Sequence, residues 1–479
     1  MKTLKEKKLY ETSGKEAVGG GTTTTLDDGT VYSKRKGFRN FTANSLDAYT
    51  GIINADKIER LQSVAQRLNG LKLLELNATA TGGGVAEMLY SSIPFVESLG
   101  IEDEWKILQG NEEYFECTKT MHNLLQGMAG SFTEKMNWTY LTNLEQCASA
   151  NLIDYTPDVV IAHDPQTLGL THYLQRPREK WLWRCHIDIE EDTLSANPEL
   201  LDIMSDWTEH YNGAIFSAAH YIVSRWSIPK FIIPPFIDPF SEKNRELTQP
   251  EIDRILVKYS IDSKVPIIAQ IGRFDPWKGL DRTIATYRRV RKEQKCQLLI
   301  AGGMASDDPE GERILTQLYN QTRKDEDVHI LNLPLANRLE NYREINALQR
   351  AATVIMQPST KEGFGLVITE ALWKGKPVIA GNCGAIPLQI KDGHTGYFYQ
   401  NPQKTAQLVA YLLNDKTAAT SLGEQAKKYV RDHFLMPDRI CDYLLAIEMS
   451  LNSPSKNHGW GECIVAFHPW AKLDKRTGG

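Results

Sequence analysis

The stretch KEGFGLVITEALWKGKPV, residues 361–378, decides the fold of this 479-residue chain. A strand-like run, TVIMQPS (353–359), comes directly before it. From Phe364 onward, apolar residues recur at the spacing of one helical face, which predicts a helix that begins in the glycine-rich turn. The turn therefore lies at the carboxyl end of a strand, where open α/β sheets bind their ligands. Free amides in the first helical turn suit an anion or sugar hydroxyls.

Two glutamates, Glu362 and Glu370, flank this turn along the predicted helix. Eight residues of helix rise about 12 Å, so the two carboxylates can contact opposite ends of one ligand. Two hydroxyl-rich ends are typical of a sugar nucleotide. The alternative is that one glutamate complements the helix dipole and the other is solvated.

Composition excludes several classes of protein. The net charge of −5 and the absence of a long basic block argue against a nucleic-acid partner. The seven cysteines are scattered and never in CxxC spacing, which predicts neither a disulfide framework nor a zinc site. No apolar run is long enough to span a bilayer, and the amino terminus lacks the apolar core of a secretory signal. These features favour a cytoplasmic protein without a membrane partner.

The order of apolar runs predicts two α/β domains. Short β-branched runs alternate with amphipathic ones from residue 71 to 238, and the alternation restarts at residue 265 after a polar segment. We expect a parallel sheet in each domain. The predicted parts are a polar tail or lid (1–45), a first α/β domain (46–245), a second one (246–437), a helix (438–452) and a carboxyl tail (453–479).

A second glycine-rich turn follows the first predicted strand, LKLLELN (71–77). Gly83 and Gly84 come just before a predicted helix, so their bare backbone can approach a phosphate closely. A tight strand-to-helix turn without a ligand is the alternative. The spacing is not that of the GxGxxG dinucleotide fingerprint, which disfavours an oxidoreductase.

Cations and titratable groups occur at the ends of three more predicted strands. Arg273 and Lys278 lie in QIGRFDPWKGLDR (270–282), where they could neutralise a departing diphosphate or be plain solvated surface. His186 ends a very apolar run, WLWRCHI, so its ring needs a partner there whether its role is structural or catalytic. Asp164 ends another predicted strand, where its carboxylate could act in the site or cap the next turn.

Four of these segments resemble the retaining GT-B glycosyltransferases of family 4, and the resemblance covers most of residues 46–450. The segments are GGGVAEML (82–89), LWRCHID (182–188), RFDPWKG (273–279) and EGFGLVITEALWKGKPVI (362–379). More narrowly, FECTKTMHNLLQG (115–127) and AHDPQ (162–166) are similar to trehalose synthases that join a nucleotide-activated glucose to free glucose. The family fold implies two Rossmann-like domains facing across a cleft, with helix 438–452 crossing back to the first domain.

The resemblance also implies a role for each candidate residue. Arg273 and Lys278 would bind the donor diphosphate, Glu362 the hydroxyls of the transferred glucose, and Glu370 the nucleotide ribose. His186 would lie near the donor sugar's 6-hydroxyl and support developing positive charge through its backbone carbonyl. The amides of Gly363, Phe364, Gly365 and Leu366 would line the donor, and Asp164 and His163 would hold the acceptor. Gly83 and Gly84 would approach the phosphates or the acceptor from the opposite domain.

Several properties stay open at the level of sequence. The resemblance implies a homodimer and no obligatory cofactor, since Mg²⁺ is compatible with the fold but not required by it. Trehalose phosphorylases, which use glucose 1-phosphate, share similar segments and are an alternative. A non-catalytic protein that binds a sugar nucleotide is another, although it would not need Arg273, Lys278 and His186 beside the two glutamates. The donor base, uracil or adenine, is not indicated.

Overall fold

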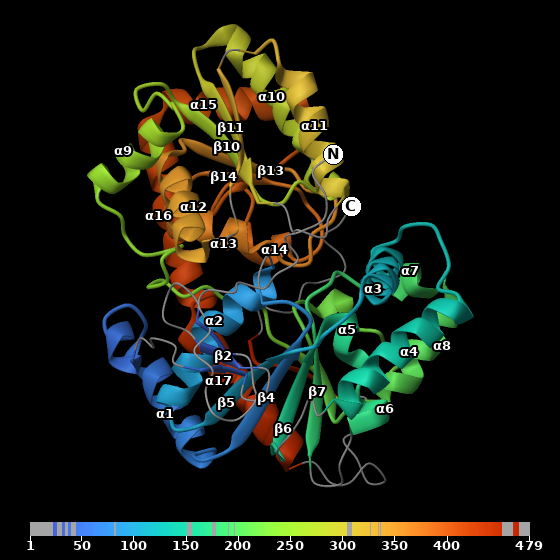
Figure 1. Ribbon diagram of the computed structural model, residues 1–479. Coiled ribbons are helices and arrows are strands. Elements are labelled where there is room, and N and C mark those ends of the chain that lie inside the picture. The colour runs from blue at the N-terminus through green and yellow to red at the C-terminus, as the bar shows by residue number, and fades with distance from the viewer. Residues whose placement is uncertain are drawn as a thin grey trace.

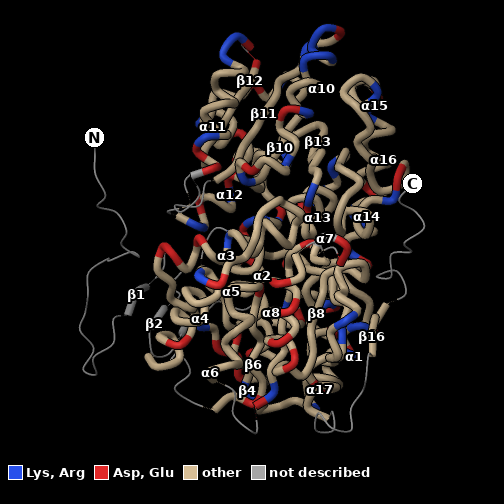
Figure 2. Tube along the Cα trace, turned by 90° about the vertical axis from the view of Figure 1, so that its right-hand side faces the viewer, with Lys and Arg blue, Asp and Glu red and all other residues tan. Residues whose placement is uncertain are grey.

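The chain folds into two α/β domains stacked end to end (Figure 1). The computed structural model describes residues 23–25, 31–33, 37–39, 45–80, 83–150, 156–174, 179–189, 191–195, 197–303, 309–325, 327–333, 335, 337–452 and 463–468. Within these ranges, Lys and Arg are interspersed with Asp and Glu on both domains (Figure 2), in keeping with a small net charge.

The first domain is built on a sheet whose central strands are all parallel. Its order is β1 (Thr23–Thr25), β2 (Val31–Ser33), β3 (Gly37–Arg39), β5 (Glu102–Ile107), β4 (Lys72–Asn77), β6 (Val159–His163), β7 (Lys180–Cys185), β8 (Gly213–Phe216), β9 (Lys230–Ile232) and β16 (Ile464–Ala466). The strands β1 to β3 pair antiparallel and meet β5 at one edge. At the other edge β16, from the predicted carboxyl tail, pairs parallel with β9.

The second domain contains a six-stranded sheet in which every pairing is parallel. Its order is β12 (Val328–Asn332), β11 (Gln297–Gly302), β10 (Ile267–Ile271), β13 (Val354–Gln357), β14 (Val378–Ala380) and β15 (Tyr397–Phe398). The strands β10, β11 and β13 are buried along their whole length, as expected for a sheet covered by helices on both faces.

Helices connect successive strands in both domains. Those of the first domain are α1 (Ala55–Arg67), α2 (Gly84–Ser98), α3 (Glu112–Leu125), α4 (Glu134–Ser149), α5 (Asp164–Leu168), α6 (Thr171–Leu174), α7 (Glu191–Ser195) and α8 (Pro198–Thr208), with short 3₁₀ turns at Leu46–Tyr49 and Ala219–Tyr221. Those of the second are α9 (Gln249–Lys258), α10 (Leu280–Glu293), α11 (Pro309–Thr322), α12 (Arg338–Ala351), α13 (Leu366–Trp373), α14 (Ile386–Gln389), α15 (Pro402–Asn414) and α16 (Lys416–His433), with a 3₁₀ turn at Pro276–Lys278.

The last helix, α17 (Met436–Leu451), returns to the first domain and packs beside α1 (Figure 1). Lys57 of α1 donates to Asp438 at 2.8 Å, and the Arg67 side chain contacts Glu448. The amphipathic pattern predicted this helix within two residues at each end. The family resemblance implied a helix that crosses back to the first domain at this place.

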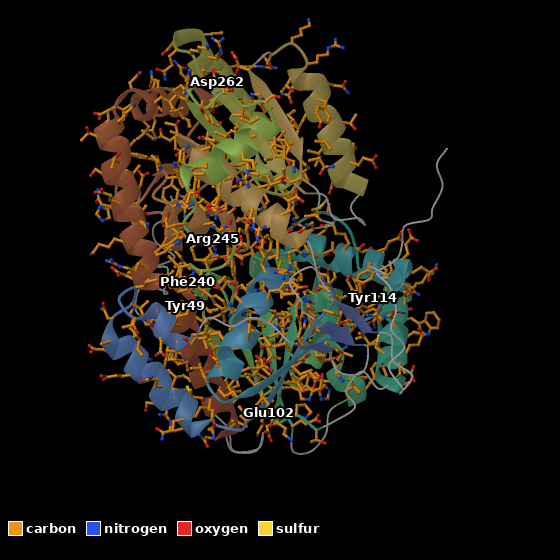
Figure 3. The ribbon with its side chains drawn as sticks, turned by 60° about the vertical axis from the view of Figure 1, so that its left-hand side comes forward. Tyr49, Glu102, Tyr114, Phe240, Arg245 and Asp262 are labelled. Carbon is orange, nitrogen blue, oxygen red and sulfur yellow. The ribbon has the colours of Figure 1, made fainter. Side chains whose placement is uncertain are left out.

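The junction between the domains is anchored on both sides (Figure 3). The Tyr49 hydroxyl donates to Asp238 at 2.9 Å, and the Tyr49 ring packs on Phe240 with centroids 5.0 Å apart. Arg245 then pairs with Glu251 at the start of the second domain, at 2.9 Å. These contacts join the segment 238–251 to both domains.

The predicted strands of both sheets are confirmed. The strands β1 to β3, β15 and β16 were not predicted, and neither was β5. Its sequence, EDEWKI, carries four charged residues, yet Trp105, Asp103 and Lys106 are buried. A strand whose charged side chains are buried has no alternation of apolar and polar residues by which to find it. Most of the predicted tail 1–45 and of the tail 453–479 lies outside the described residues.

Candidate active site

The turn that decides the fold joins β13 to α13 and faces the other domain. Gly365 caps the helix with φ at 84°, in the left-handed region that glycine adopts without steric cost. Phe364 is buried against Phe434, with ring centroids 5.6 Å apart, while Leu366 stays half-buried. A Cβ atom placed on Gly363 would overlap the backbone carbonyl oxygen of His186. The two domains therefore meet backbone to backbone at this glycine.

Glu362, in the turn between β13 and α13, forms an ion pair with Lys278. Lys278 Nζ lies 2.6 Å from one carboxylate oxygen of Glu362 and 2.9 Å from the other, and Ser359 donates to Glu362 at 3.3 Å. Both side chains are largely buried, so the pair is held in a fixed geometry. The sequence predicted both residues for the donor but did not predict their direct contact.

Arg273 lies on the loop after β10 and is the exposed member of this group. Its side chain is 47% exposed, and Nη2 contacts Asp275 Oδ2 at 3.3 Å. Because this surface contact is long, the guanidinium keeps donors for an anionic ligand. Arg273 also acts on His122 of α3: burial first, then Lys119 and Arg273, lower the pKa of His122 from 6.5 to about 4.

Glu370, predicted to contact a ribose, is 2% exposed and already has protein partners. Its Oε1 lies 3.0 Å from Lys243 Nζ, and Gln349 donates to its Oε2 at 3.3 Å. Lys243 also donates to Glu87 of α2. Burial disfavours the ammonium of Lys243, but Glu370 and Glu87 outweigh it and raise its pKa. A ribose would have to share Glu370 with Lys243 or replace it.

His186, at the end of β7, is anchored through its backbone and its ring. Its amide N–H donates to Asp164 Oδ1 at 2.8 Å, and its Nε2 lies 2.9 Å from His163 Nδ1. Asp164 has φ at 60°, a backbone conformation that costs a residue with a side chain about 1–3 kcal/mol. Burial raises the pKa of Asp164 to about 6, against the opposing effects of the His186 amide, His163 and Arg184.

His163, predicted to hold the acceptor, has protein partners on both ring nitrogens. Its Nδ1 meets His186, and its Nε2 lies 2.6 Å from Glu75 of β4. The residue is 4% exposed. A direct contact with an acceptor would require one of these two bonds to break.

The predicted glycine turn at Gly83 and Gly84 faces the same region from the first domain. Gly83 caps α2, and both glycines are exposed. A Cβ atom on Gly84 would lie 3.1 Å from the Leu366 side chain at the start of α13. The amino termini of α2 and α13 thus converge, and their partial positive charges act on one point between the domains.

Three site residues were not singled out from the sequence. The Tyr221 hydroxyl lies 3.0 Å from the carbonyl oxygen of Glu362 and 2.9 Å from that of Gly363, so its proton bridges the domains. Asp188 is buried beside this contact and accepts from Gln126 of α3. Asp188 and Gln126 lie inside LWRCHID and FECTKTMHNLLQG, so the motifs contained them, but periodicity did not distinguish them from neighbours.

Over the described residues, no cluster of three or more His, Cys, Asp or Glu side chains is arranged to hold a metal ion. The same residues include no helix long and apolar enough to cross a membrane.

Comparison with known proteins gives family matches along both domains. Residues 75–223 match the family described as trehalose synthase, N-terminal domain, and residues 251–429 match glycosyl transferases group 1. The chain is 40% identical over 403 residues to a trehalose synthase from Pyrococcus horikoshii, covering 83% of this chain and 95% of that protein.

More distant relatives and structures share parts of this similarity. A trehalose phosphorylase from Pleurotus pulmonarius is 27% identical over 81% of this chain, which spans 58% of that protein. The solved structure of alpha,alpha-trehalose 6-phosphate synthase from Burkholderia multivorans matches with a TM-score of 0.60 at 15% identity, covering 80% of this chain and 98% of that one. At this identity the match shows the fold alone.

The contact between Gly363 and His186 predicts a steric effect at the domain interface. Gly363→Ala places a methyl group where the His186 carbonyl oxygen lies, so one of the two backbones must move. Because a displacement of about 1 Å at a reacting centre can cost about 100-fold in rate, we expect turnover to fall by that order. Steady-state kinetics measure the loss, and an unchanged thermal unfolding midpoint shows that each domain remains folded. Full turnover in the variant would contradict this geometry.

The lowered pKa of His122 predicts a dependence of stability on pH. Between pH 6.5 and about 4 the unfolded chain binds a proton at His122 that the folded chain does not. Stability is therefore lost as pH falls below 6.5, by on the order of 1 kcal/mol at pH 5.5. Urea unfolding of the wild type and of His122→Asn at pH 7 and 5.5 measures the contribution of His122 to the free energy of unfolding. The variant should lose less stability than the wild type over the same interval.

Proposed function

We propose that this chain, which belongs to the trehalose synthase family of glycosyltransferases, makes trehalose from a nucleoside-diphosphate glucose and glucose in a reversible reaction with retention of configuration. The observation that carries the proposal is the convergence of two helix amino termini on the Lys278–Glu362 pair. Helix amino termini bind phosphate groups, and a carboxylate beside them suits sugar hydroxyls.

The donor diphosphate is placed between the amino termini of α2 and α13. Lys278 has three N–H donors and gives at least one to Glu362, which leaves others for a phosphate oxygen. Arg273, whose contact with Asp275 is exposed, supplies a second cation. Both cations stabilise the charge that develops on the departing diphosphate. The ribose is assigned to Glu370, which lies further along α13, and to Lys243, which lies at the junction between the domains.

The transferred glucose lies next to Glu362 and His186 in this proposal. Glu362 accepts hydrogen bonds from the sugar hydroxyls, and the carbonyl of His186 faces the anomeric carbon. The bond from that carbon to the diphosphate breaks while the acceptor hydroxyl bonds to it on the same face. The hydroxyl proton passes to the departing phosphate oxygen, so no protein nucleophile is consumed. Catalysis then consists of positioning and electrostatic stabilisation.

The acceptor glucose is assigned to the side of the first domain. Asp164 is held near His186 by the hydrogen bond to the His186 amide, and its second carboxylate oxygen can accept from an acceptor hydroxyl. Asp188, buried beside Gly363, is a further carboxylate on this side. The reaction needs no metal ion in this proposal, and EDTA should leave the rate unchanged.

A product assay tests the proposed reaction. Purified protein is given glucose with UDP-glucose, ADP-glucose or glucose 1-phosphate in separate reactions, and trehalose is quantified by chromatography. We expect trehalose with a nucleoside-diphosphate glucose. Trehalose from glucose 1-phosphate alone would assign the chain to phosphorolysis instead. Binding of the sugar nucleotide without product in any reaction would indicate a non-catalytic protein.

We expect that removing the charge of Lys278 greatly reduces the rate of glucosyl transfer. In Lys278→Ala the diphosphate loses a cation, so we expect kcat to fall by about 100-fold or more. Glu362 also loses its buried partner, which lowers the unfolding midpoint, so kinetics are measured at a temperature at which the variant is folded. The matched control is Lys428→Ala, since Lys428 is 71% exposed on α16 and contacts Asp432 at 3.8 Å. A Lys278→Ala variant as active as this control would refute the assignment.

A further inference from the structure

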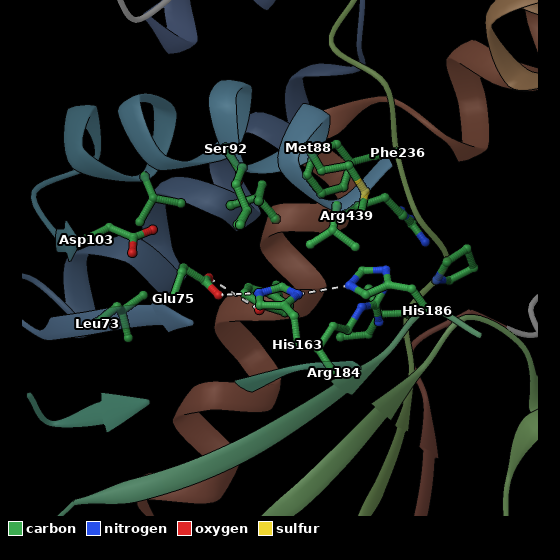
Figure 4. Close-up of a pocket in the computed structure, with 17 residues that line it drawn as sticks. Leu73, Glu75, Met88, Ser92, Asp103, His163, Arg184, His186, Phe236 and Arg439 are labelled. Carbon is green, nitrogen blue, oxygen red and sulfur yellow. Dashed lines mark hydrogen bonds and ion pairs between the residues drawn. The ribbon is translucent and has the colours of Figure 1, made fainter. Parts of the chain in front are cut away.

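A buried chain of hydrogen bonds leads from Glu75 through His163 to His186 (Figure 4). Glu75 Oε2 lies 2.6 Å from His163 Nε2, and His163 Nδ1 lies 2.9 Å from His186 Nε2. The two rings are within 11° of parallel, an orientation that suits a hydrogen bond because the ring N–H bonds and lone pairs lie in the ring planes. The chain connects the interior of the first domain to the candidate active site.

The fold places these three groups on neighbouring strands. Glu75 is on β4, His163 ends β6 and His186 follows β7, and β4, β6 and β7 are consecutive and parallel in the sheet. Glu75 is 2% exposed and lies in the apolar run LKLLELN, where a carboxylate is costly unless it has partners. Its partners are His163 and the Tyr443 hydroxyl of α17, which donates to Oε1 at 3.4 Å.

Charged side chains around the cavity that Glu75 and His163 line determine the direction of these hydrogen bonds. Asp103 lines the same cavity of about 30 Å³, and burial followed by the nearby Glu75 raises its pKa well above the ordinary value. Arg184 and Arg439 also line the cavity, so a protonated His163 would add a third cation to it.

The direction of the hydrogen bonds follows from these charges. A carboxylate can only accept, so His163 carries its proton on Nε2 and presents a lone pair at Nδ1. His186 must then donate from its own Nε2. Burial first, then Arg184, keep the pKa of His186 well below 6.5, so the ring is neutral and, with its one proton on Nε2, has none on Nδ1. Nδ1 has no partner among the described residues, and His186 is half-buried.

We propose that Glu75 and His163 are positioning residues that hold His186 with its proton on Nε2 and a lone pair on Nδ1. This inference rests on the proposed function, in which Nδ1 accepts a hydrogen bond from a hydroxyl of the transferred glucose. The other tautomer would present an N–H at Nδ1 and could not accept this hydrogen bond. Glu75 thus acts on the substrate through two imidazole rings.

The test is a double-mutant cycle on trehalose formation. In Glu75→Gln the amide can donate as well as accept, so it no longer dictates the proton on His163. We expect kcat to fall on the order of 10- to 100-fold with little change in the KM for glucose. The matched control is Asp103→Asn, which changes another buried acid lining the same cavity and should retain wild-type turnover.

The cycle separates positioning from a general structural effect. If Glu75 acts through His186, Glu75→Gln should cost little once His186→Ala has removed the ring. An equal loss from Glu75→Gln with and without His186 would overturn the proposal, as would a loss in Asp103→Asn equal to that in Glu75→Gln. Thermal unfolding midpoints of all variants identify any that do not fold.

A spectroscopic measurement on the wild-type protein does not depend on the variants or on activity. Protein labelled with ¹⁵N in histidine shows, by imidazole chemical shift, which ring nitrogen of His186 carries the proton, and the His186→Asn spectrum identifies its signals. We expect a lone-pair signal for Nδ1 and an N–H signal for Nε2. The reverse pattern would overturn the proposal. Absence of trehalose synthesis in the wild type would overturn the proposed function while leaving this spectrum decisive.

Discussion

The close approach of the Gly363 backbone to the His186 carbonyl is the constraint on which the site depends. No side chain fits between the two domains there, so position 363 must be glycine, and the loop after β13 is held against the end of β7. Tyr221 reinforces the contact by donating to the carbonyls of Glu362 and Gly363. Since α13 begins at this loop, the same contact aims its amino terminus at the first domain. The convergence with α2 follows from it.

The buried ion pairs near this contact join distant parts of the chain. Lys278 and Glu362 pair across 84 residues, and Lys243 bridges Glu87 and Glu370, which belong to different domains. Buried charges without partners would cost several kcal/mol each, so the pairs allow a strongly polar site inside a domain interface. They also mean that a bound ligand exchanges existing contacts rather than making wholly new ones. Specificity then follows from which partners a ligand can replace.

Much of the fold could be predicted because the patterns that indicate its strands and turns involve residues close together in the sequence. Buried parallel strands appear as short apolar runs, and glycine-rich turns mark where strands give way to helices, as at Gly83 and Gly365. The two mainly parallel sheets confirm the predicted fold class, and the matches along both domains confirm the family. Lys278, Glu362 and His186 were also predicted as candidates, since each follows a predicted strand. Their roles, like the domain boundaries, stay predictions.

The residues that could not be predicted are those whose burial or partners differ from what the neighbouring sequence indicates. Glu75 sits in an apolar strand and is indistinguishable there from a solvated residue until β6 and β7 place His163 and His186 beside it. Lys243, the partner of Glu370, lies 127 residues away in the polar junction between the domains. Asp103 is buried although its strand, β5, has a highly charged sequence. These residues are polar although they are buried, which lowers the stability of the fold. Natural proteins contain such residues where a functional site requires a particular arrangement of groups. The left-handed backbone of Asp164 is a further case: a strained residue presents its carboxylate to the His186 amide, so the strain and the hydrogen bond together fix where His186 points. The polar interior of the first domain is therefore organised around one histidine at the interface.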